Sequence, residues 1–247
     1  MSTSVLQACE LTDQKLPQFI LIREEYGADA SFLITSILGQ CLKFQQNGVV
    51  LVCLHHLSQH YANAGVRLGF NLTMAKDKGR IQLIEPLLDI GTNCLSSKYL
   101  TAPKNEIFES LLNEIKENTQ NQLQSKENIS IIIDNVAMFS YLGYSKDSIL
   151  RLCHKLVDFV NTNDRVSLVL KVNLSHLNKE IVTSLEDYAS SNITVSKLKS
   201  GEFQEVDGRI VCKKRKDHFK YTEKTILYKI GDRNVKVFQP GEVGIKA

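Results

Sequence analysis

Short apolar runs alternate with longer stretches of helical period from residue 17 to residue 190. The runs of strand length are residues 17–22, 49–56, 80–87, 127–135 and 165–174. Apolar residues at three- and four-residue steps, typical of amphipathic helices, occupy residues 30–46, 57–69, 105–124, 145–163 and 178–190. Strands that alternate with helices are typical of crossover units. The chain is therefore predicted to have an α/β fold, with a mostly parallel central sheet and helices on both faces.

Capping and turn residues indicate where these elements end. Ser58 and Ser145 stand at the starts of helical stretches and are candidate N-caps. Residues 90–104 show neither period and are predicted to form a loop. After residue 190, apolar and polar residues tend to alternate, with turn signals at Ser200-Gly201, Asp207-Gly208 and Gly231-Asp232. We therefore expect antiparallel C-terminal hairpins that extend the far edge of the sheet.

Composition indicates one ordinary globular domain. Of the 247 residues, 43% are hydrophobic and 23% are charged, with a formal net charge of +3. No secretory signal is visible, and the apolar runs are far shorter than a membrane span. The six cysteines form no CxxC pair, which favours a reduced cytosolic or nuclear protein. Residues 15–247 are predicted to form a single domain behind a flexible N-terminus at residues 1–14.

The connection between the first strand and the first helix is where a nucleotide-binding α/β protein holds phosphate. The template GxxxxGK[ST] supplies glycine N–H groups, a lysine and a hydroxyl. Here Glu24 and Asp29 occupy the glycine positions, Ala30 the lysine position, and only the hydroxyl of Ser31 remains. Carboxylates repel phosphate where a lysine would attract it, and Gly-Lys occurs nowhere in the chain. We therefore predict no cofactor and no autonomous ATP site, and Asp29 or Ser31 could simply cap the helix.

The other half of such a site is an apolar strand that ends in an aspartate able to organise a metal ion. The segment "ISIIIDN" places Asp134 in this position. A carboxylate at a strand end is common, so this signal is weak by itself. In the first interpretation, Asp134 is a relic of a lost nucleotide site. The alternative is a divergent NTPase that still holds nucleotide through its backbone and magnesium through Asp134.

Four segments together carry a resemblance to a known family: "DASFLITSIL", "HYANAGVRLGFNLTMAKDKGRI", "IIIDNVAMFSYLG" and "FKYTEKTILYKIGDRNVKVFQPG". They resemble the family of subunit 6 of the Elongator complex, RecA-like ATPase relatives that lack the phosphate-binding lysine. The similarity extends from about residue 15 to residue 243. It implies a RecA-like three-layer fold, and the missing glycines and lysine agree with this family.

The resemblance also implies a function. Members of this family join two paralogous RecA-like subunits, Elongator subunits 4 and 5, in a hetero-hexameric ring. The ring docks on the larger catalytic Elongator assembly and supports modification of the wobble uridine of tRNA, U34. The expected protein is a non-catalytic subunit, cytoplasmic or also nuclear, without a membrane partner. A DNA-binding paralogue of the recombination type, with the same core, is a further alternative.

The segment richest in cationic residues lies near the C-terminus, and aromatic residues alternate with its cations. Contact with RNA requires this combination. The candidate RNA-contact residues are Lys213, Lys214, Arg215, Lys216, Phe219 and Lys220. The alternative is that these lysines protect an exposed edge strand from aggregation. A second basic cluster, at Arg67, Lys76, Lys78 and Arg80, is a candidate subunit interface or RNA contact, against a plain solvated loop.

Histidines are the remaining candidates for chemistry. His56 and His60 have the i, i+4 spacing that can hold zinc on a helix, and His55 precedes them. The sequence between them is not HExxH, and His55 and His56 flank a predicted strand end, so we expect them to point to opposite faces. No third ligand is identifiable, and we therefore predict no metal site.

Overall fold

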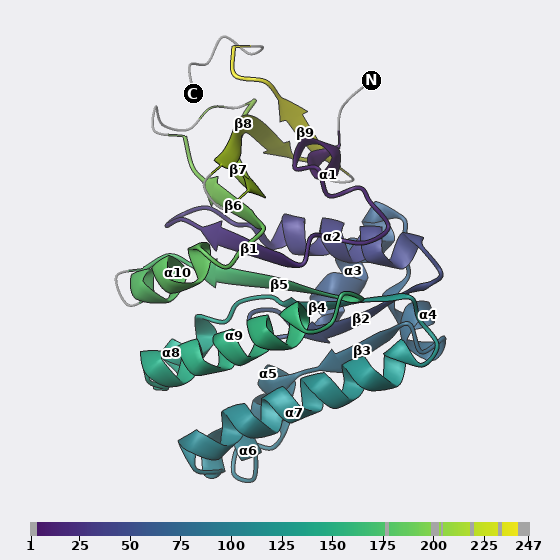
Figure 1. Ribbon diagram of the computed structural model, residues 1–247, viewed down its shortest axis with the longest axis vertical. Coiled ribbons are helices and arrows are strands. Elements are labelled where there is room, and N and C mark those ends of the chain that lie inside the picture. Colours follow the sequence, from purple (N-terminus) through teal and green to yellow (C-terminus); the bar gives the residue numbers. More distant parts are fainter. Residues whose placement is uncertain are drawn as a thin grey trace.

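The computed structural model describes residues 4–175, 178–198, 203, 205–217, 220–231 and 234–241. Its centre is one twisted sheet, with helices against both faces (Figure 1). The strand order is β3-β2-β4-β5-β1-β6-β7-β8-β9. The strands are β1 (Phe19–Glu24), β2 (Asn47–Val52), β3 (Ile81–Ile84), β4 (Asn128–Ile133), β5 (Val166–Asn173), β6 (Ser191–Ser196), β7 (Gly208–Asp217), β8 (Lys220–Ile230) and β9 (Val235–Phe238).

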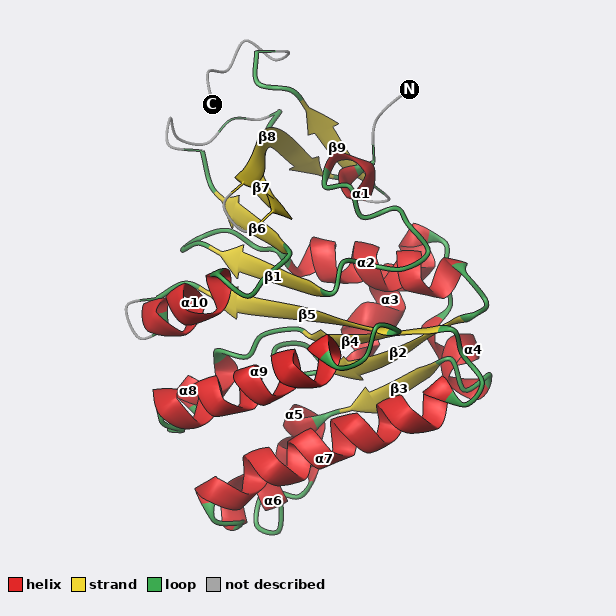
Figure 2. Cartoon of the chain, in the orientation of Figure 1, coloured by secondary structure: helices red, strands yellow, loops and turns green. Residues whose placement is uncertain are grey.

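Helices form the two outer layers (Figure 2). They are α1 (Val5–Ala8), α2 (Ser31–Lys43), α3 (Ser58–Leu68), α4 (Leu72–Asp77), α5 (Pro86–Thr92), α6 (Lys98–Thr101), α7 (Lys104–Leu123), α8 (Met138–Tyr141), α9 (Lys146–Asn161) and α10 (Lys179–Glu186). The buried side chains of α1 to α4 join one core cluster, and those of α6 to α10 join a second cluster across the sheet. No helix in the described part of the chain combines the length and apolar content that a bilayer crossing requires.

The direction of the strands agrees with the predicted fold class. Strands β3, β2, β4, β5, β1 and β6 pair in parallel, and β7, β8 and β9 continue the sheet as antiparallel strands. The expected α/β fold with a mostly parallel sheet and antiparallel C-terminal strands is confirmed. Strand β6 joins the two parts, because it pairs in parallel with β1 and antiparallel with β7.

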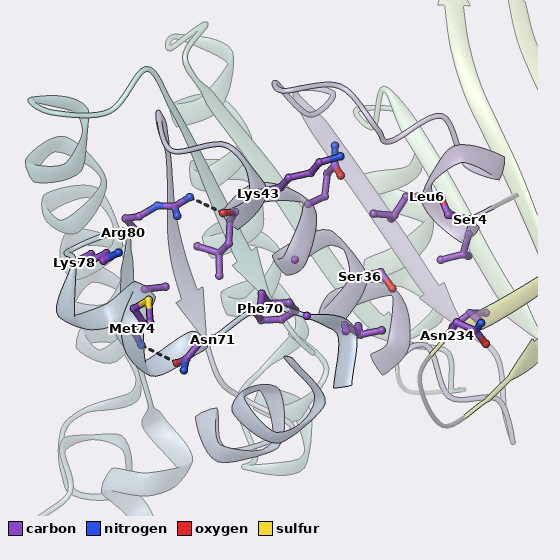
Figure 3. Close-up of a pocket in the computed structure, with 18 of the residues that line it drawn as sticks. Ser4, Leu6, Ser36, Lys43, Phe70, Asn71, Met74, Lys78, Arg80 and Asn234 are labelled. Atoms are coloured by element: carbon purple, nitrogen blue, oxygen red, sulfur yellow. Dashed lines mark hydrogen bonds between the residues drawn. The ribbon is translucent and has the colours of Figure 1, made fainter. Parts of the chain in front are cut away.

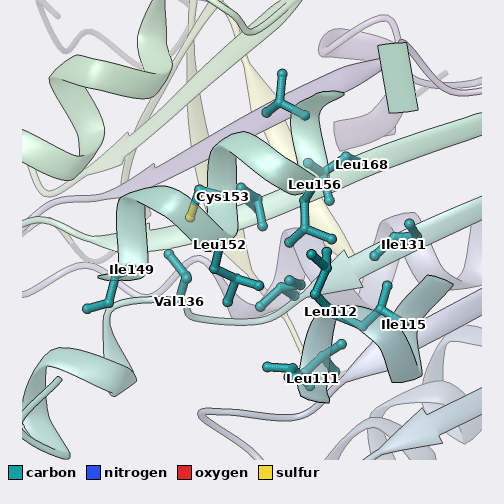
Figure 4. Close-up of a cluster of buried hydrophobic side chains, with 14 of the residues drawn as sticks. Leu111, Leu112, Ile115, Ile131, Val136, Ile149, Leu152, Cys153, Leu156 and Leu168 are labelled. Carbon is teal, nitrogen blue, oxygen red and sulfur yellow. The ribbon is translucent and has the colours of Figure 1, made fainter. Parts of the chain in front are cut away.

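Burial explains why the central strands read as unbroken apolar runs. In β4, Ile131 and Ile133 contribute to the core under α7 and α9, whereas Ile132 faces the core under α2. Successive side chains of a strand point to opposite faces, so a strand covered on both sides needs apolar residues at every position. Figure 4 shows the first of these cores, where Leu112 of α7 and Leu156 of α9 lie over the sheet.

Several helices and caps differ from the sequence prediction. The segment 90–104, expected to be a loop, contains the end of α5 and all of α6; Pro86 stands at the first turn of α5, where its missing N–H costs nothing. Ser145 does cap α9, since its hydroxyl accepts a hydrogen bond from the Ser148 N–H (3.3 Å). Ser58 does not cap α3, because Leu57 holds that position and the Ser58 N–H donates to the Glu85 carboxylate (3.2 Å).

The N-terminal segment contains a short helix that the sequence did not predict. Residues 5–8 form α1, which is capped by the Ser4 hydroxyl. The buried side chains of Val5, Leu6 and Leu11 belong to the core under α2. Glu10 forms an ion pair with Lys214 of β7 (2.9 Å). Apolar residues that cover the end of α2 therefore hold this segment on the domain.

Phe70 fastens α3 to α2 because glycines leave room for its ring. A Cβ atom added at Gly65 of α3 would lie 2.6 Å from the Phe70 ring, and one at Gly39 of α2 would lie 3.0 Å from it. The Phe70 N–H also donates to the Gly65 carbonyl (2.9 Å). Both helices can approach the ring closely only without side chains at these positions.

We expect Gly65→Ala to lower the free energy of unfolding by about 1–3 kcal/mol, because overpacking outweighs the gain in helix propensity. Urea unfolding measures the change, and Gly65→Ala combined with Phe70→Leu should recover part of it. Gly91→Ala in α5 is the control, since a Cβ atom there meets no atom within 4 Å. Equal effects of the two alanine substitutions would contradict the packing argument.

Candidate functional site

The candidate site lies at the carboxyl ends of β4, β5 and β1, beneath the N-terminus of α2. These strands are neighbours in the sheet. Glu24 ends β1, Asp134 follows β4, and Lys171 lies near the end of β5. In each strand the residue two positions earlier (Ile22, Ile132 and Val169) belongs to the core on the α2 side. Because side chains alternate along a strand, all three ionisable groups are directed to the face that carries α2.

Glu24 and Lys171 form a buried ion pair at this position. The Lys171 ammonium lies 2.8 Å from the Glu24 carboxylate, and the two side chains are 0% and 6% exposed. The same carboxylate oxygen accepts the backbone N–H of Ala30 (2.8 Å). An N–H group at the start of α2, which would face phosphate in a nucleotide-binding protein, therefore donates to an internal carboxylate.

Asp29 acts in the same way one residue further along the chain. Its carboxylate accepts the N–H of Ser31 (2.8 Å), at the first residue of α2. The N-cap position is Ala30, which has no side-chain acceptor. The prediction that Asp29 or Ser31 could cap the helix thus holds for Asp29, which provides the acceptor. The Ser31 hydroxyl lies 3.0 Å from Nε2 of His56.

Asp134 is fully buried and accepts hydrogen bonds from four donors. One carboxylate oxygen accepts the N–H groups of Leu54 (2.6 Å) and His55 (3.0 Å). The other accepts the N–H of His56 (3.0 Å) and the hydroxyl of Tyr61 (2.9 Å). The carboxylate therefore fixes the turn between β2 and α3, and the same low-dielectric surroundings raise the pKa of Tyr61.

The three histidines come together beside this carboxylate. The rings of His55 and His56 have centroids 4.2 Å apart, and those of His56 and His60 are stacked at 4.0 Å. The expectation that His55 and His56 point to opposite faces is therefore wrong, because the chain turns directly after β2. His55 Nδ1 lies 3.3 Å from the Lys171 ammonium. No cluster of three or more His, Cys, Asp or Glu suited to a metal ion occurs among the described residues.

Burial and neighbouring positive charge keep the rings of His55 and His56 neutral. Burial, His60, His55 and Lys171 together lower the pKa of His56 to about 4. Burial and the Lys171 ammonium lower the pKa of His55. At neutral pH the ring nitrogens of His55 and His56 are therefore hydrogen-bonding partners, and Lys171 supplies a cation at the centre of the site.

Stability is expected to fall as the pH decreases from about 7 to about 4. The unfolded chain protonates His56 near pH 6.5, whereas the folded chain keeps it neutral down to about pH 4. The unfolded state binds more protons in this window, so acid favours unfolding. Because the ring is partly solvated, we expect a loss of about 1–2 kcal/mol. Urea unfolding across the window measures it, and His56→Gln should show a smaller loss; an identical pH dependence would contradict this account.

Lys171 is the site residue that sequence analysis missed. It lies within "SLVLKVNL", a strand that is otherwise buried on both faces. A lysine in the interior of such a run is itself a signal, since lysine is almost never fully buried unless it is paired. The sequence alone identifies its acidic partner, Glu24, only as a lost glycine position of the phosphate loop.

The basic residues near the C-terminus are divided between the two faces of the β7–β8 ribbon. Register pairs Lys213 with Glu223 and Arg215 with Tyr221, whereas Lys214 alternates to the other face. Lys213 forms an ion pair with Glu223 (3.4 Å), and Arg215 lies over the ring of Tyr221 (5.6 Å) and donates to its hydroxyl (3.1 Å). Lys216 and Lys220 are exposed, and Phe219 lies outside the described residues. The residues predicted to form one RNA contact thus do not share one face.

The second basic cluster also separates into different roles. Arg67, Lys76 and Lys78 are exposed on α3, α4 and the turn that follows. Arg80 is half-buried, and its guanidinium donates to the carbonyls of Leu42 (2.7 Å) and Phe44 (2.6 Å) at the C-terminal end of α2. Arg80 therefore caps α2, as cations at helix C-termini do.

Solved structures of low sequence identity share this fold. A crystal structure of a KaiC-like protein from the archaeon Pyrococcus horikoshii matches with a TM-score of 0.64 over 91% of each chain, at 12% identity. An uncharacterized protein from the same archaeon, crystallised with an unknown peptide, matches with a TM-score of 0.64 at 13% identity, over 91% of this chain and 92% of that one. At such identities the likeness concerns the fold, and it agrees with the predicted RecA-like architecture.

Sequence comparisons are more specific. Elongator complex protein 6 of Drosophila melanogaster is 38% identical over 251 aligned positions that cover 100% of both chains. The protein of the same name from Danio rerio is 34% identical over 146 positions, which cover 53% of this chain and 52% of that one. The family model described as "Elongation complex protein 6" matches residues 3–232. With its RecA-like sheet and a phosphate loop occupied by internal carboxylates, the chain belongs to the Elongation complex protein 6 family.

Proposed function

We propose that this chain is a non-catalytic subunit of the Elongator complex. The observation that carries the proposal is the occupied phosphate loop: the N–H groups of Ala30 and Ser31 donate to Glu24 and Asp29, and Lys171 neutralises Glu24 within the protein. A triphosphate would have to displace two carboxylates and separate a buried ion pair. Membership of the Elongation complex protein 6 family supports the assignment to the complex.

In this proposal, residues 15–247 act as one RecA-like domain in a hetero-hexameric ring with Elongator subunits 4 and 5. The ring supports modification of tRNA U34 by the larger catalytic assembly, in the cytoplasm or also in the nucleus. The support for these partners is the family resemblance. Co-expression with subunits 4 and 5, followed by analytical ultracentrifugation, tests the ring: a chain that stays monomeric and indifferent to both paralogues would overturn it.

The rival interpretation, a divergent NTPase that uses Asp134 for magnesium, has a direct test. We expect no ATP turnover above background by the purified chain, and no change in melting temperature on addition of ATP and magnesium. In the rival interpretation, nucleotide with magnesium would stabilise the chain by mass action. Reproducible turnover that Asp134→Asn abolishes, in a variant shown to remain folded, would support the rival.

Contact with tRNA is proposed for the exposed cations at the tip of the β7–β8 ribbon. Lys216 and Lys220 have no acidic partner among the described residues, whereas Lys213 and Lys214 pair with Glu223 and Glu10. If both free lysines contact phosphates, Lys216→Ala with Lys220→Ala should reduce the slope of log affinity against log salt by about 1.5 units.

The matched control is Lys146→Ala with Lys155→Ala, two lysines on α9 that form ion pairs with Glu180 and Glu109. Affinity for tRNA is measured with the assembled ring at several salt concentrations. An unchanged slope in the ribbon variant would assign these lysines to protection of the sheet edge. Equal competition by duplex DNA and tRNA would favour the recombination-type paralogue.

A further inference from the structure

A solvent-open cavity of about 610 Å³ lies on the α2 side of the molecule, away from the phosphate loop. Its walls come from the C-terminal half of α2, the α3–α4 connection, α1 and the start of β9 (Figure 3). We call it the α2 groove and define it by Lys43, Leu68, Phe70, Met74, Lys78 and Lys236. Segments distant in the sequence thus meet around one depression, which the phosphate-loop site does not use.

The floor of the α2 groove is apolar and partly uncovered. Met74 is 52% exposed and Leu68 is 40% exposed, although both are large apolar side chains. Phe70 lies between Met74 and α2 (Figure 3), held against Gly39 and Gly65. Methionine is common on surfaces that bind protein segments, because its flexible thioether adapts to different partners. Uncovered apolar side chains in a concave site indicate a contact surface.

The rim of the α2 groove is positively charged. Lys43, Lys78 and Lys236 are exposed, and within the described part of the chain none of them has an acidic partner. Arg80 adds a fourth cation, already committed to the end of α2. No aspartate or glutamate is found among the described residues that line the cavity. On the β7–β8 ribbon, by contrast, Lys213 and Lys214 have acidic neighbours within the chain.

The basic rim and the apolar floor of the α2 groove together indicate what kind of ligand it binds. We propose that the α2 groove binds an acidic amphipathic segment of a partner protein, whose apolar side chains cover Leu68 and Met74 while its carboxylates meet the three lysines. Such a segment matches an apolar groove with a basic rim. Single-stranded RNA is a poorer match, because stacking needs open aromatic faces, and Phe70, the one aromatic ring among the described lining residues, packs against two glycines.

Photo-crosslinking in the native assembly tests the occupant. A photoreactive amino acid replaces Met74 in the full chain expressed in cells, and the assembly is purified, irradiated and analysed by mass spectrometry. The control places the same group at Leu95, which is 93% exposed and does not line the groove. We expect Met74 to crosslink to one protein segment that is rich in aspartate and glutamate with interspersed apolar residues. Crosslinks to RNA, to no segment, or to the segments also found from Leu95 would overturn the proposal.

Charge reversal tests the rim independently. Lys43→Glu with Lys78→Glu should reduce the yield of that crosslink at least about tenfold, because attraction at two positions becomes repulsion. Lys43→Arg with Lys78→Arg should retain it. Lys15→Glu with Lys179→Glu produces the same change in net charge at exposed sites outside the groove and should leave the yield within about twofold. If both glutamate variants lost crosslink yield equally, the loss would reflect overall charge, and the proposed role of the rim lysines would be overturned.

The result is separable from the proposed function. The inference needs a protein partner but not a particular one, so a crosslinked acidic segment in any chain would support the groove, and the ring keeps its own test by ultracentrifugation. Conversely, a ring that assembles normally while Met74 yields no segment-specific crosslink would contradict the groove alone. Thermal unfolding of every variant confirms that the fold is retained.

Discussion

Lys171→Met should lower the free energy of unfolding by about 3–5 kcal/mol, one of the two largest effects that we expect from a single substitution in this chain. Methionine fills the volume of the lysine stem but leaves the Glu24 carboxylate buried without its cation. Glu24 then keeps only the Ala30 N–H, which lies 2.8 Å away. Chemical denaturation of the purified chain, with partners present if they are required for solubility, measures the change.

A compensating variant separates loss of charge balance from loss of packing. Lys171→Met combined with Glu24→Gln should recover much of the stability, because a neutral amide needs no buried cation and can still accept the Ala30 N–H. Lys146→Met is the matched surface control; its ion pair with Glu180 is exposed, and we expect less than about 1 kcal/mol. If the double variant is no more stable than Lys171→Met, the ion pair is not what the lysine contributes.

The second large effect is expected at Asp134. Asp134→Ala removes the acceptor of four hydrogen bonds: the buried N–H of Leu54, the half-buried N–H groups of His55 and His56, and the Tyr61 hydroxyl lose this partner. We expect a loss of about 3–5 kcal/mol. Asp134→Asn should cost less, since its carbonyl oxygen still satisfies two donors, but its amide nitrogen then faces the other two.

This prediction also bears on magnesium. If Asp134 served only as a metal ligand, its removal would relieve buried charge and change stability little in metal-free buffer. We therefore expect the destabilisation to be the same in the presence of EDTA and of excess magnesium. A wild-type chain that melts at a higher temperature with magnesium, and an Asp134→Asn variant that does not, would assign the carboxylate to metal instead.

The fold was predictable because burial on both faces of a sheet leaves a pattern in the sequence. The run before Asp134 and the amphipathic period of α9 predicted elements within a few residues of their observed ends. Helix α6 was not predicted within residues 90–104, because a helix of four residues, Lys98–Thr101, is too short to show a period. Helix α1 was not predicted for a related reason: its four residues are stabilised by contacts with α2, which no local pattern contains.

The candidate site was predictable in part. The absence of the lysine and glycines from the phosphate loop could be read directly, and so could the position of Asp134. What fills the loop could not, because Glu24 and Lys171 are brought together only by the pairing of β1 with β5. The division of the basic ribbon is similar. Adjacent cations in "KKRK" alternate between faces, so proximity in the sequence places Lys213 and Lys214 on opposite sides.

The Glu24–Lys171 pair has a consequence for descent. Conversion of this loop to the phosphate-binding template would require glycine at position 24, which leaves Lys171 as an uncompensated buried cation, or loss of Lys171 first, which leaves Glu24 uncompensated. Either first substitution lowers the free energy of unfolding by several kcal/mol, which is a large fraction of the stability of an ordinary domain. Selection that acts one substitution at a time would therefore retain the occupied loop of the proposed non-catalytic subunit. The ion pair therefore opposes a single change at either of its two positions. It predicts that, in relatives, a change at position 24 is accompanied by a change at position 171.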